Sequence, residues 1–166
     1  EMFKLPYALI RNMFAFRFEI QDSDSAATVR DKLERGIAAF LGPKSARRAA
    51  AIGNLIGFDY SNSPHLKGED PQQLTQLGQY SITEFFARVA NDKPTVIFLD
   101  DIHWADDKSI DLMNHIIRTK RGLRLLVVCL TRPALLERRV LPWTDQSEFH
   151  TRLDLRPLSK DDTRSL

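Results

Sequence analysis

Two adjacent carboxylates, Asp100 and Asp101, directly follow an apolar run in the stretch PTVIFLDDIHWADD, residues 94–107. The run from Thr95 to Leu99 is short, rich in Val, Ile and Phe, and without polar alternation, which is typical of a buried strand. Two negative charges at the end of such a strand repel each other and lose solvation, so a cation is expected beside them. Mg²⁺ prefers one or two carboxylates together with water and phosphate oxygens. The pattern predicts that Asp100 holds Mg²⁺, directly or through water.

A second polar pair, Thr131 and Arg132, follows the next apolar run, LRLLVVCL at 123–130. Ligands of parallel sheets bind outside the carboxyl ends of the strands, and arginine is a bidentate partner for phosphate. Together the two strand ends predict a phosphoryl-transfer site. In it Asp101 orients or deprotonates the attacking water, Arg132 senses the terminal phosphate, and Thr131 helps to bind the nucleotide.

The same four positions also have a purely structural interpretation. Asp100 and Asp101 would then form a strand-terminal turn or a helix cap. Thr131 and Arg132 would simply end a strand before Pro133. Both interpretations remain open on the residues alone.

Structural roles are favoured for the other polar, aromatic and thiol side chains near these strand ends. His103 is expected to be packed or capping, and Trp104 to lie in the core, with shielding of an adenine or a lid contact as the alternative. Asp106 and Asp107 are expected to cap the helix that starts near Ser109. Arg138 and Arg139 are expected to lie on a solvated helix face and not to act as an arginine finger. Cys129 is expected to be a core residue.

The elements that position these residues are mostly helical in the first half and alternate between strand and helix in the second. Helical spacing of apolar residues is found at 25–41, 44–58, 70–89 and 109–118. The first of these helices has Ser23, Asp24 or Ser25 as its N-cap, and the third begins with Asp70 and Pro71. Continuous apolar runs predict central strands at 95–99 and 123–130, the first covered on both faces, and alternation predicts an edge strand from Phe149 to Leu155. This order predicts a parallel α/β sheet.

Composition narrows the classes of protein further. The 166 residues, of which 43% are hydrophobic and 28% charged, fit one soluble domain. A formal charge of +2 does not favour nucleic-acid binding, and no apolar stretch is long enough to span a membrane. The single cysteine provides no disulfide framework, so we expect a cytoplasmic protein.

Three longer stretches resemble a known family. VIFLDD resembles the Walker B strand of P-loop NTPases, and PTVIFLDDIHWADDKSIDLM, LRLLVVCLTRPALLERRVLPW and LDLRPLSKDD, in this order, resemble the AAA-type ATPase module of the STAND class. That module occurs in multidomain bacterial signalling proteins, beside adenylate or guanylate cyclase domains, kinases or LuxR-type DNA-binding domains. The resemblance implies a P-loop NTPase-like parallel sheet flanked by helices, ATP with Mg²⁺ as ligands, Asp100 and Asp101 as Walker B acids, and Arg132 as the sensor.

The resemblance also implies how the chain is organised within one domain. Residues 1–92 would be its mainly helical N-terminal part, and 93–166 would run from the Walker B strand through the sensor strand to the start of the lid. His103 and Trp104 belong to the tail of the family's acidic motif, and no chemistry for them follows from the sequence.

A phosphate-binding loop of the form G-x-x-x-x-G-K-[ST] is absent from the sequence. The nearest string, GIAAFLGPKS, has Pro43 between Gly42 and Lys44, and its first half follows an apolar helical stripe. We therefore expect a fragment that lacks the Walker A strand, binds ATP poorly by itself and hydrolyses it negligibly. Its unpaired strand edges would favour self-association.

Two classes of function follow. In the first, the chain is part of the ATP-hydrolysing module of a multidomain signal-transduction protein, such as one linked to adenylate cyclase, and the effector domain lies in the same longer chain. In the second, it is a regulatory or scaffolding module that binds partner proteins without turnover. A third hypothesis is the ATPase part of a LuxR-type regulator, in which another domain contacts DNA.

Overall fold

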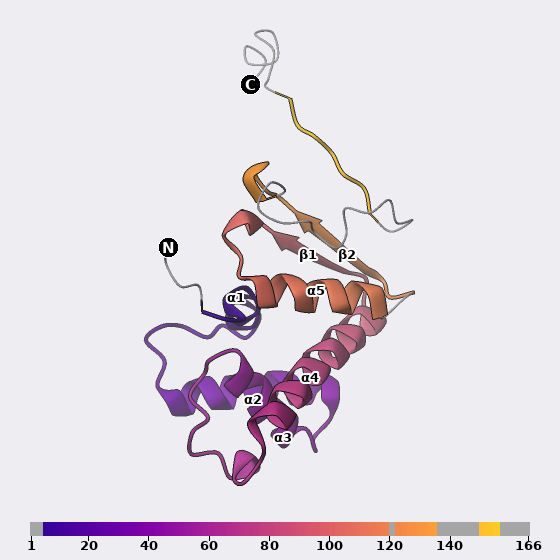
Figure 1. The fold of residues 1–166 in the computed structure, drawn as a ribbon. Helices are drawn as coiled ribbons and strands as arrows, with labels where there is room; N and C mark the ends of the chain where they lie inside the picture. The colour runs from indigo at the N-terminus through magenta and orange to yellow at the C-terminus, as the bar shows by residue number, and fades with distance from the viewer. Residues whose placement is uncertain (1–4, 120–121, 136–149, 157–166) are drawn as a thin grey trace.

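The computed structural model describes residues 5–119, 122–135 and 150–156. In chain order the elements are α1 (Ala8–Arg17), α2 (Ala26–Leu41), α3 (Ala46–Leu55), the 3-10 helix η1 (Pro64–Leu66), α4 (Pro71–Asp92), β1 (Thr95–Leu99), the 3-10 helix η2 (Ile102–Trp104), α5 (Asp107–Thr119) and β2 (Leu125–Cys129). Helices α2, α3 and α4 lie at one end of the molecule, and α5 lies between them and the two strands (Figure 1). The mixed helix and strand order agrees with the predicted α/β class.

Side-chain caps begin two of the predicted helices. Ser25 Oγ accepts a hydrogen bond from the Thr28 backbone N–H at 3.1 Å at the start of α2. Asp70 accepts from the Gln73 N–H at 2.9 Å at the start of α4, where Pro71 occupies the first turn. These contacts satisfy amide groups that would otherwise lack a partner inside the helix. The predicted caps are therefore confirmed.

Helix α1 was not predicted from the sequence. Its N-cap, Tyr7, has a left-handed backbone with φ 62°, and its side chain makes no capping hydrogen bond. The apolar residues of this helix lie on more than one of its sides: Ile10 and Phe14 are buried, whereas Phe16 is exposed. Neither a local cap nor a single apolar stripe was thus present to indicate a helix.

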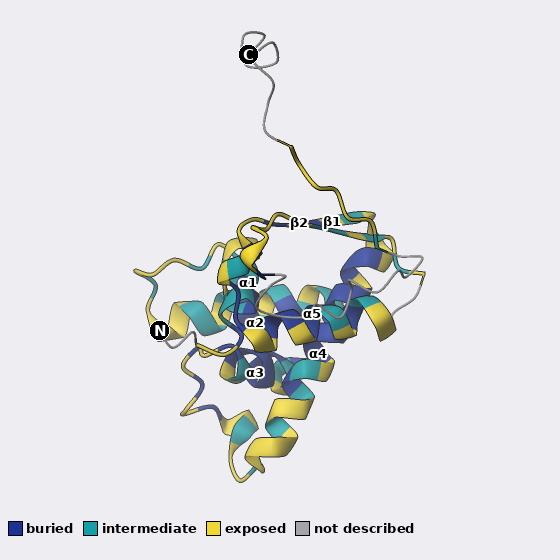
Figure 2. Cartoon of the chain, turned by 45° about the horizontal axis from the view of Figure 1, so that its top comes forward, coloured by how far each residue is buried: buried dark blue, intermediate teal, exposed yellow. Residues whose placement is uncertain are grey.

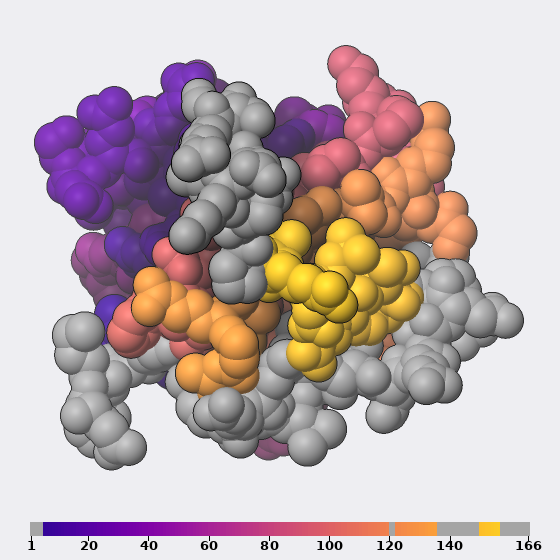
Figure 3. Space-filling model, turned by 90° about the horizontal axis from the view of Figure 1, so that it is seen from above, coloured from indigo at the N-terminus to yellow at the C-terminus, as the bar shows by residue number. Residues whose placement is uncertain are grey.

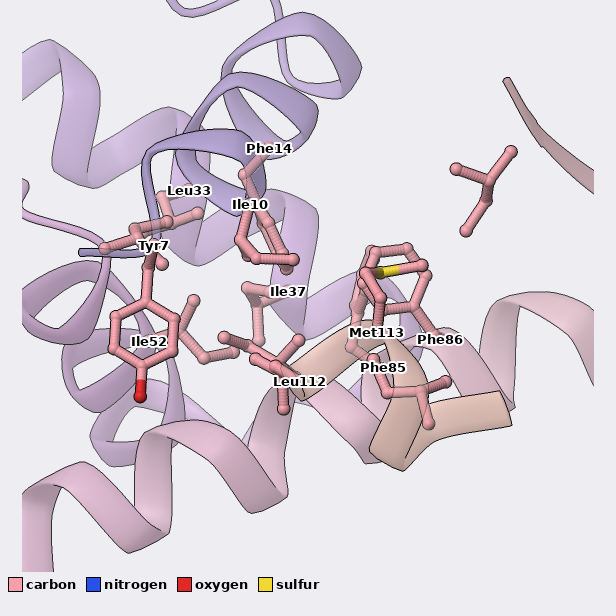
Figure 4. Close-up of a cluster of buried hydrophobic side chains, with 14 of the residues drawn as sticks. Tyr7, Ile10, Phe14, Leu33, Ile37, Ile52, Phe85, Phe86, Leu112 and Met113 are labelled. Atoms are coloured by element: carbon pink, nitrogen blue, oxygen red, sulfur yellow. The ribbon is translucent and has the colours of Figure 1, made fainter. Parts of the chain in front are cut away.

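Aromatic rings from three helices meet in the core. Phe14 of α1 lies with its ring centroid 5.2 Å from that of Phe85 and 6.0 Å from that of Phe86, both on α4. Phe40 of α2 packs edge-on against Phe85 at 5.3 Å. Figure 4 shows Phe85 and Phe86 together beside Met113 of α5. Pairs at these distances contribute about 0.5–1.5 kcal/mol each beyond their buried area.

The strands β1 and β2 pair in parallel, with Thr95 opposite Leu125 and Leu99 opposite Cys129. Ile97 and Leu99 are buried against the helices, whereas Val96, Phe98 and Leu126 on the opposite face are exposed. Figure 2 shows the strands at one side of the helices. The prediction that β1 is covered on both faces was wrong for the described residues, because helices cover one face only.

Two further predictions need correction at the end of the described chain. Cys129 is exposed where β2 ends and is not a core residue. Residues 150–156, predicted to form most of an edge strand, pair with no described strand, and Leu153 and Leu155 are exposed. Figure 3 shows this segment at the surface, on the same side of the molecule as β2 and the residues that follow it. Phe149, Arg138 and Arg139 lie outside the described residues.

Within the described part of the chain, no helix combines the length and the apolar character needed to cross a membrane.

Helices α3 and α4 approach so closely that one position on α4 has no room for a side chain. A Cβ at Gly78 would lie 2.9 Å from the Ala51 carbonyl oxygen and 3.0 Å from the Leu55 side chain. The backbone of α3 cannot yield as a flexible side chain would. Glycine at this position therefore sets the spacing between the two helices.

We predict that Gly78→Ala lowers the free energy of unfolding by about 1–3 kcal/mol, because the added methyl overpacks the α3–α4 contact. At an uncrowded helical site the same change would raise stability by up to about 1 kcal/mol. Urea unfolding followed by circular dichroism measures the difference. Arg88→Ala, on the exposed side of α4, is the control. A Gly78→Ala chain as stable as wild type would contradict the close approach.

Candidate functional site

Backbone hydrogen bonds continue the β1–β2 ladder beyond the two strands. The Leu130 N–H donates to the Leu99 carbonyl at 2.9 Å, and the Ile102 N–H donates to the Leu130 carbonyl at 3.0 Å. The segment that carries Asp100 and Asp101 therefore runs beside Leu130, directly before Thr131 and Arg132. The structure thus brings the two predicted pairs to one edge of the sheet. All four residues are exposed, so the acids do not lie on the buried side as their position in the sequence suggested.

Asp101 has a left-handed backbone, with φ 51° and ψ 40°. It begins the 3-10 helix η2, which is closed by hydrogen bonds from the Trp104 N–H to the Asp101 carbonyl and from the Ala105 N–H to the Ile102 carbonyl, both 2.9 Å long. Aspartate tolerates this conformation better than most residues, at a cost of about 1–2 kcal/mol. The turn folds the chain back on itself directly after the acids.

The turn brings His103 next to Asp101. The imidazole Nδ1 lies 3.4 Å from Asp101 Oδ1, a distance at which a protonated histidine forms an ion pair. The histidine side chain is 9% exposed and the aspartate side chain 60% exposed. The packed imidazole therefore lies beside a carboxylate that faces solvent. The expectation that His103 is packed is confirmed.

Trp104 does not lie in the core, contrary to the prediction. It is 66% exposed, and its ring centroid lies 5.0 Å from that of His103 with the rings tilted by 43°. The sequence did not indicate this surface position, because tryptophan is highly buried on average.

Asp106 is a cap for two helices. Its carboxylate accepts from the Ser109 N–H at 2.9 Å and the Ser109 hydroxyl at 2.6 Å at the start of α5. It also accepts from the N–H groups of Tyr7 at 2.8 Å and Leu9 at 3.3 Å at the start of α1. The predicted α5 cap is confirmed, with Asp107 in the first turn of that helix. The α1 cap was missed, because the two partners are 99 residues apart in sequence.

The pKa of Asp106 lies below its usual range although the residue is only 5% exposed. Burial opposes the charged form. Hydrogen bonds from the Ser109 hydroxyl and N–H, and then from the Tyr7 and Leu9 N–H groups, outweigh that effect and lower the pKa. The carboxylate is thus charged at neutral pH, where it also interacts favourably with two helix N-termini.

A cleft of about 530 Å³ lies between α4 and α5 and is lined by Tyr7, Gln76, Gln79, Tyr80, Thr83, Lys108, Asp111, Leu112, His115 and Thr119. Two of the lining residues are linked, since Gln79 Nε2 donates to the Tyr7 hydroxyl at 2.8 Å. None of the four predicted site residues lines this cleft, so it is separate from the strand ends.

A comparison with protein families identifies the chain. The model described as "AAA ATPase domain" matches residues 5–128, which include the helices α1 to α5, strand β1, the acidic turn and β2 as far as Val128. The chain belongs to this family. AAA ATPase domains bind ATP with Mg²⁺, so the predicted ligands agree with the family.

One curated relative carries no functional description. An uncharacterized protein of Rhizobium meliloti (strain 1021) is 31% identical to this AAA ATPase domain over 96 residues, which make up 58% of this chain and 9% of the relative. The chain therefore spans a small part of the length of that protein. No solved structure matches the chain.

The strand ends fit part of a Mg²⁺–ATP site. Asp100 and Asp101 supply exposed carboxylate oxygens, the kind of ligand that Mg²⁺ prefers. Within residues 5–119, 122–135 and 150–156, no cluster of three or more His, Cys, Asp or Glu side chains is arranged to hold a metal ion. A site completed by water and phosphate oxygens does not need such a cluster. The amide cradle and lysine of a P-loop are not part of the sequence.

We predict that Asp106→Ala lowers the free energy of unfolding by about 2–4 kcal/mol at pH 7, because two helices each lose a cap that contributes about 1–2 kcal/mol. Because the folded pKa is depressed, the stabilising contribution of Asp106 is complete above the unfolded pKa of about 3.9 and is lost as the pH falls through the folded value. Urea unfolding between pH 7 and pH 3 measures both effects.

The matched control is Asp107→Ala, at the exposed neighbouring position. It should change stability by less than about 1 kcal/mol. The loss of stability on acidification should be shallower in Asp106→Ala than in wild type. Parallel pH profiles for the two proteins would contradict the assigned role of this carboxylate.

Proposed function

We propose that this chain is part of the ATP-binding and ATP-hydrolysing module of a cytoplasmic multidomain signal-transduction protein of the STAND class. The observation that supports the proposal is the ladder that continues past β1 and β2, since it runs the segment of the acids beside Leu130, which directly precedes Thr131 and Arg132. Membership of the AAA ATPase family supports the same conclusion.

The four strand-end residues would act on the water and phosphates of ATP. Asp100 holds Mg²⁺, directly or through water, and Asp101 accepts a proton from the attacking water. The water oxygen forms a bond to the γ-phosphorus as the bond to the β–γ bridging oxygen breaks, which gives ADP and inorganic phosphate. Arg132 contacts the terminal phosphate, and Thr131 lies beside the nucleotide. Bound Mg²⁺ neutralises charge on the phosphate oxygens.

His103 adds an orienting contact to this arrangement. Its Nδ1 lies 3.4 Å from Asp101 Oδ1, close enough for the imidazole to orient the exposed carboxylate in the proposed site. Orientation of a general base relative to its water is worth a large factor in rate, because small misplacements are costly. We therefore include His103 in the proposed site.

The phosphate-binding loop would come from a part of the protein outside this sequence. Without its lysine and amide groups, the 166 residues should bind ATP weakly. The effector domain, including an adenylate cyclase if one is present, would also lie elsewhere in the longer protein.

A second candidate is a regulatory module that binds a partner protein without turnover. It is favoured by the exposed apolar face formed by Val96, Phe98 and Leu126, and by the missing phosphate loop. Apolar faces of this kind are common at protein interfaces. Hydrolysis by the longer protein distinguishes the two candidates.

We predict that Asp101→Asn in the longer protein lowers kcat for ATP hydrolysis by about 10²–10⁴-fold, because the general base is lost. Binding of Mg²⁺–ATP should persist, since Asp100 remains. Steady-state phosphate release and equilibrium binding of a fluorescent ATP analogue measure the two effects. Asp107→Asn, outside the strand ends, is the control. Unchanged hydrolysis in Asp101→Asn would overturn the proposed site, and a wild-type protein that binds a partner but never hydrolyses ATP would support the regulatory module.

A further inference from the structure

Trp104 lies on the surface, and its ring is in tilted contact with that of a packed neighbour. Two thirds of the residue is exposed, whereas the His103 side chain is 9% exposed. The two ring centroids lie 5.0 Å apart, within the range of aromatic pairs that attract each other. An exposed indole therefore contacts a largely buried imidazole at the acidic turn.

We propose that Trp104 is a positioning residue that holds the His103 imidazole against the carboxylate of Asp101. This inference rests on the proposed function, in which Asp101 accepts the proton of the attacking water. Trp104 itself touches neither water nor phosphate in this arrangement, so it acts through the histidine.

The contacts form a continuous series through the turn. The indole packs on the imidazole, and the imidazole Nδ1 lies 3.4 Å from Asp101 Oδ1. The Trp104 N–H donates to the Asp101 carbonyl, which closes the turn and sets the spacing of the three side chains. Removing the indole would expose one face of the imidazole and allow further rotamers, whose entropy would compete with the contact to Asp101.

The backbone beneath these side chains is anchored independently of Trp104. Ile102 is 3% exposed, and its N–H donates to the Leu130 carbonyl of the extended ladder. On the other side, Ala105 and Asp106 are buried. A change of the indole should therefore disturb the side chains of the turn and leave its backbone in place.

The first test uses nuclear magnetic resonance on this chain, where no nucleotide is needed. In wild type we expect nuclear Overhauser contacts between the indole protons of Trp104 and the Hδ2 and Hε1 protons of His103. In Trp104→Leu the ring-current shifts of these histidine protons should disappear, whereas Trp104→Phe should retain part of them. The amide signals of Ile102 and Leu130 should stay in place in both variants.

Two outcomes of this test overturn the inference. The first is the absence of the indole–imidazole contacts in wild type, a measurement that does not depend on the folding of any variant. The second is a Trp104→Leu chain whose His103 ring signals and side-chain couplings equal those of wild type.

The second test measures ATP hydrolysis by the longer protein. Trp104→Leu should lower kcat by about 10- to 100-fold with little change in KM for ATP, since the base is misoriented while the nucleotide contacts remain. Trp104→Phe should retain more of kcat than Trp104→Leu. Adding Trp104→Leu to His103→Ala should cause no further loss, because the indole acts through the imidazole.

If the loss of kcat in the double variant equals the product of the two single losses, the positioning role is overturned. A Trp104→Leu protein that hydrolyses ATP like wild type while Asp101→Asn is inactive would also overturn it. If Asp101→Asn hydrolyses ATP normally, the proposed function itself fails and the catalytic role of Trp104 fails with it. The resonance experiment then still reports whether the indole–imidazole contact exists, so the two failures are distinguishable.

Discussion

The buried carboxylate of Asp106 is the contact on which the arrangement of this chain depends. Removing a charge from water is costly, and the cost is offset here by four hydrogen bonds from Tyr7, Leu9 and Ser109, together with the positive ends of two helices. Because α1 and α5 begin at the same carboxylate, neither can move along its axis without leaving amide groups or a charge unpaired. This fixes α1 in the aromatic core and α5 beneath the strands.

The same residue defines one end of the segment that carries the acids of the proposed site. That segment begins at Asp100, is attached to the sheet by the hydrogen bond from Ile102 to Leu130, and ends at Asp106. The side chains of Asp100, Asp101 and Trp104 lie at the surface, while both ends of the segment are held in place. The exposed acids remain hydrated, so their charges do not destabilise the folded state and do not require a metal ion for its stability. They are thereby left free to bind a ligand, as expected of residues displayed on a rigid scaffold.

The elements and their caps were largely predictable, since each depends on local pattern. Ser25, Asp70 and Asp106 cap the helices that follow them, and the two apolar runs form the parallel strands. The features that escaped prediction depend on distant partners. Helix α1 has its cap 99 residues away, and β1 has the same apolar pattern whether one or both of its faces are covered.

The candidate site was predicted at the level of the strand ends and not of the side chains around them. Parallel strands bring their carboxyl ends to one edge, so it follows from topology that the acids lie at the same edge as the segment that leads into Thr131 and Arg132. The left-handed backbone of Asp101, the contact with His103 and the exposure of Trp104 arise from the geometry of a single turn. No periodicity in the sequence reports such geometry.

The long separation between Tyr7 and Asp106 has a consequence for how the chain is made. A ribosome synthesises the residues of α1 well before those of its capping carboxylate, and domains generally fold as the chain emerges. Until Asp106 appears, α1 has neither a side-chain cap nor the aid of α5, and an uncapped ten-residue helix is marginal in water. Helices α2, α3 and α4, whose contacts are closer in sequence, can assemble earlier. The first helix of the chain would thus be among the last to become stable.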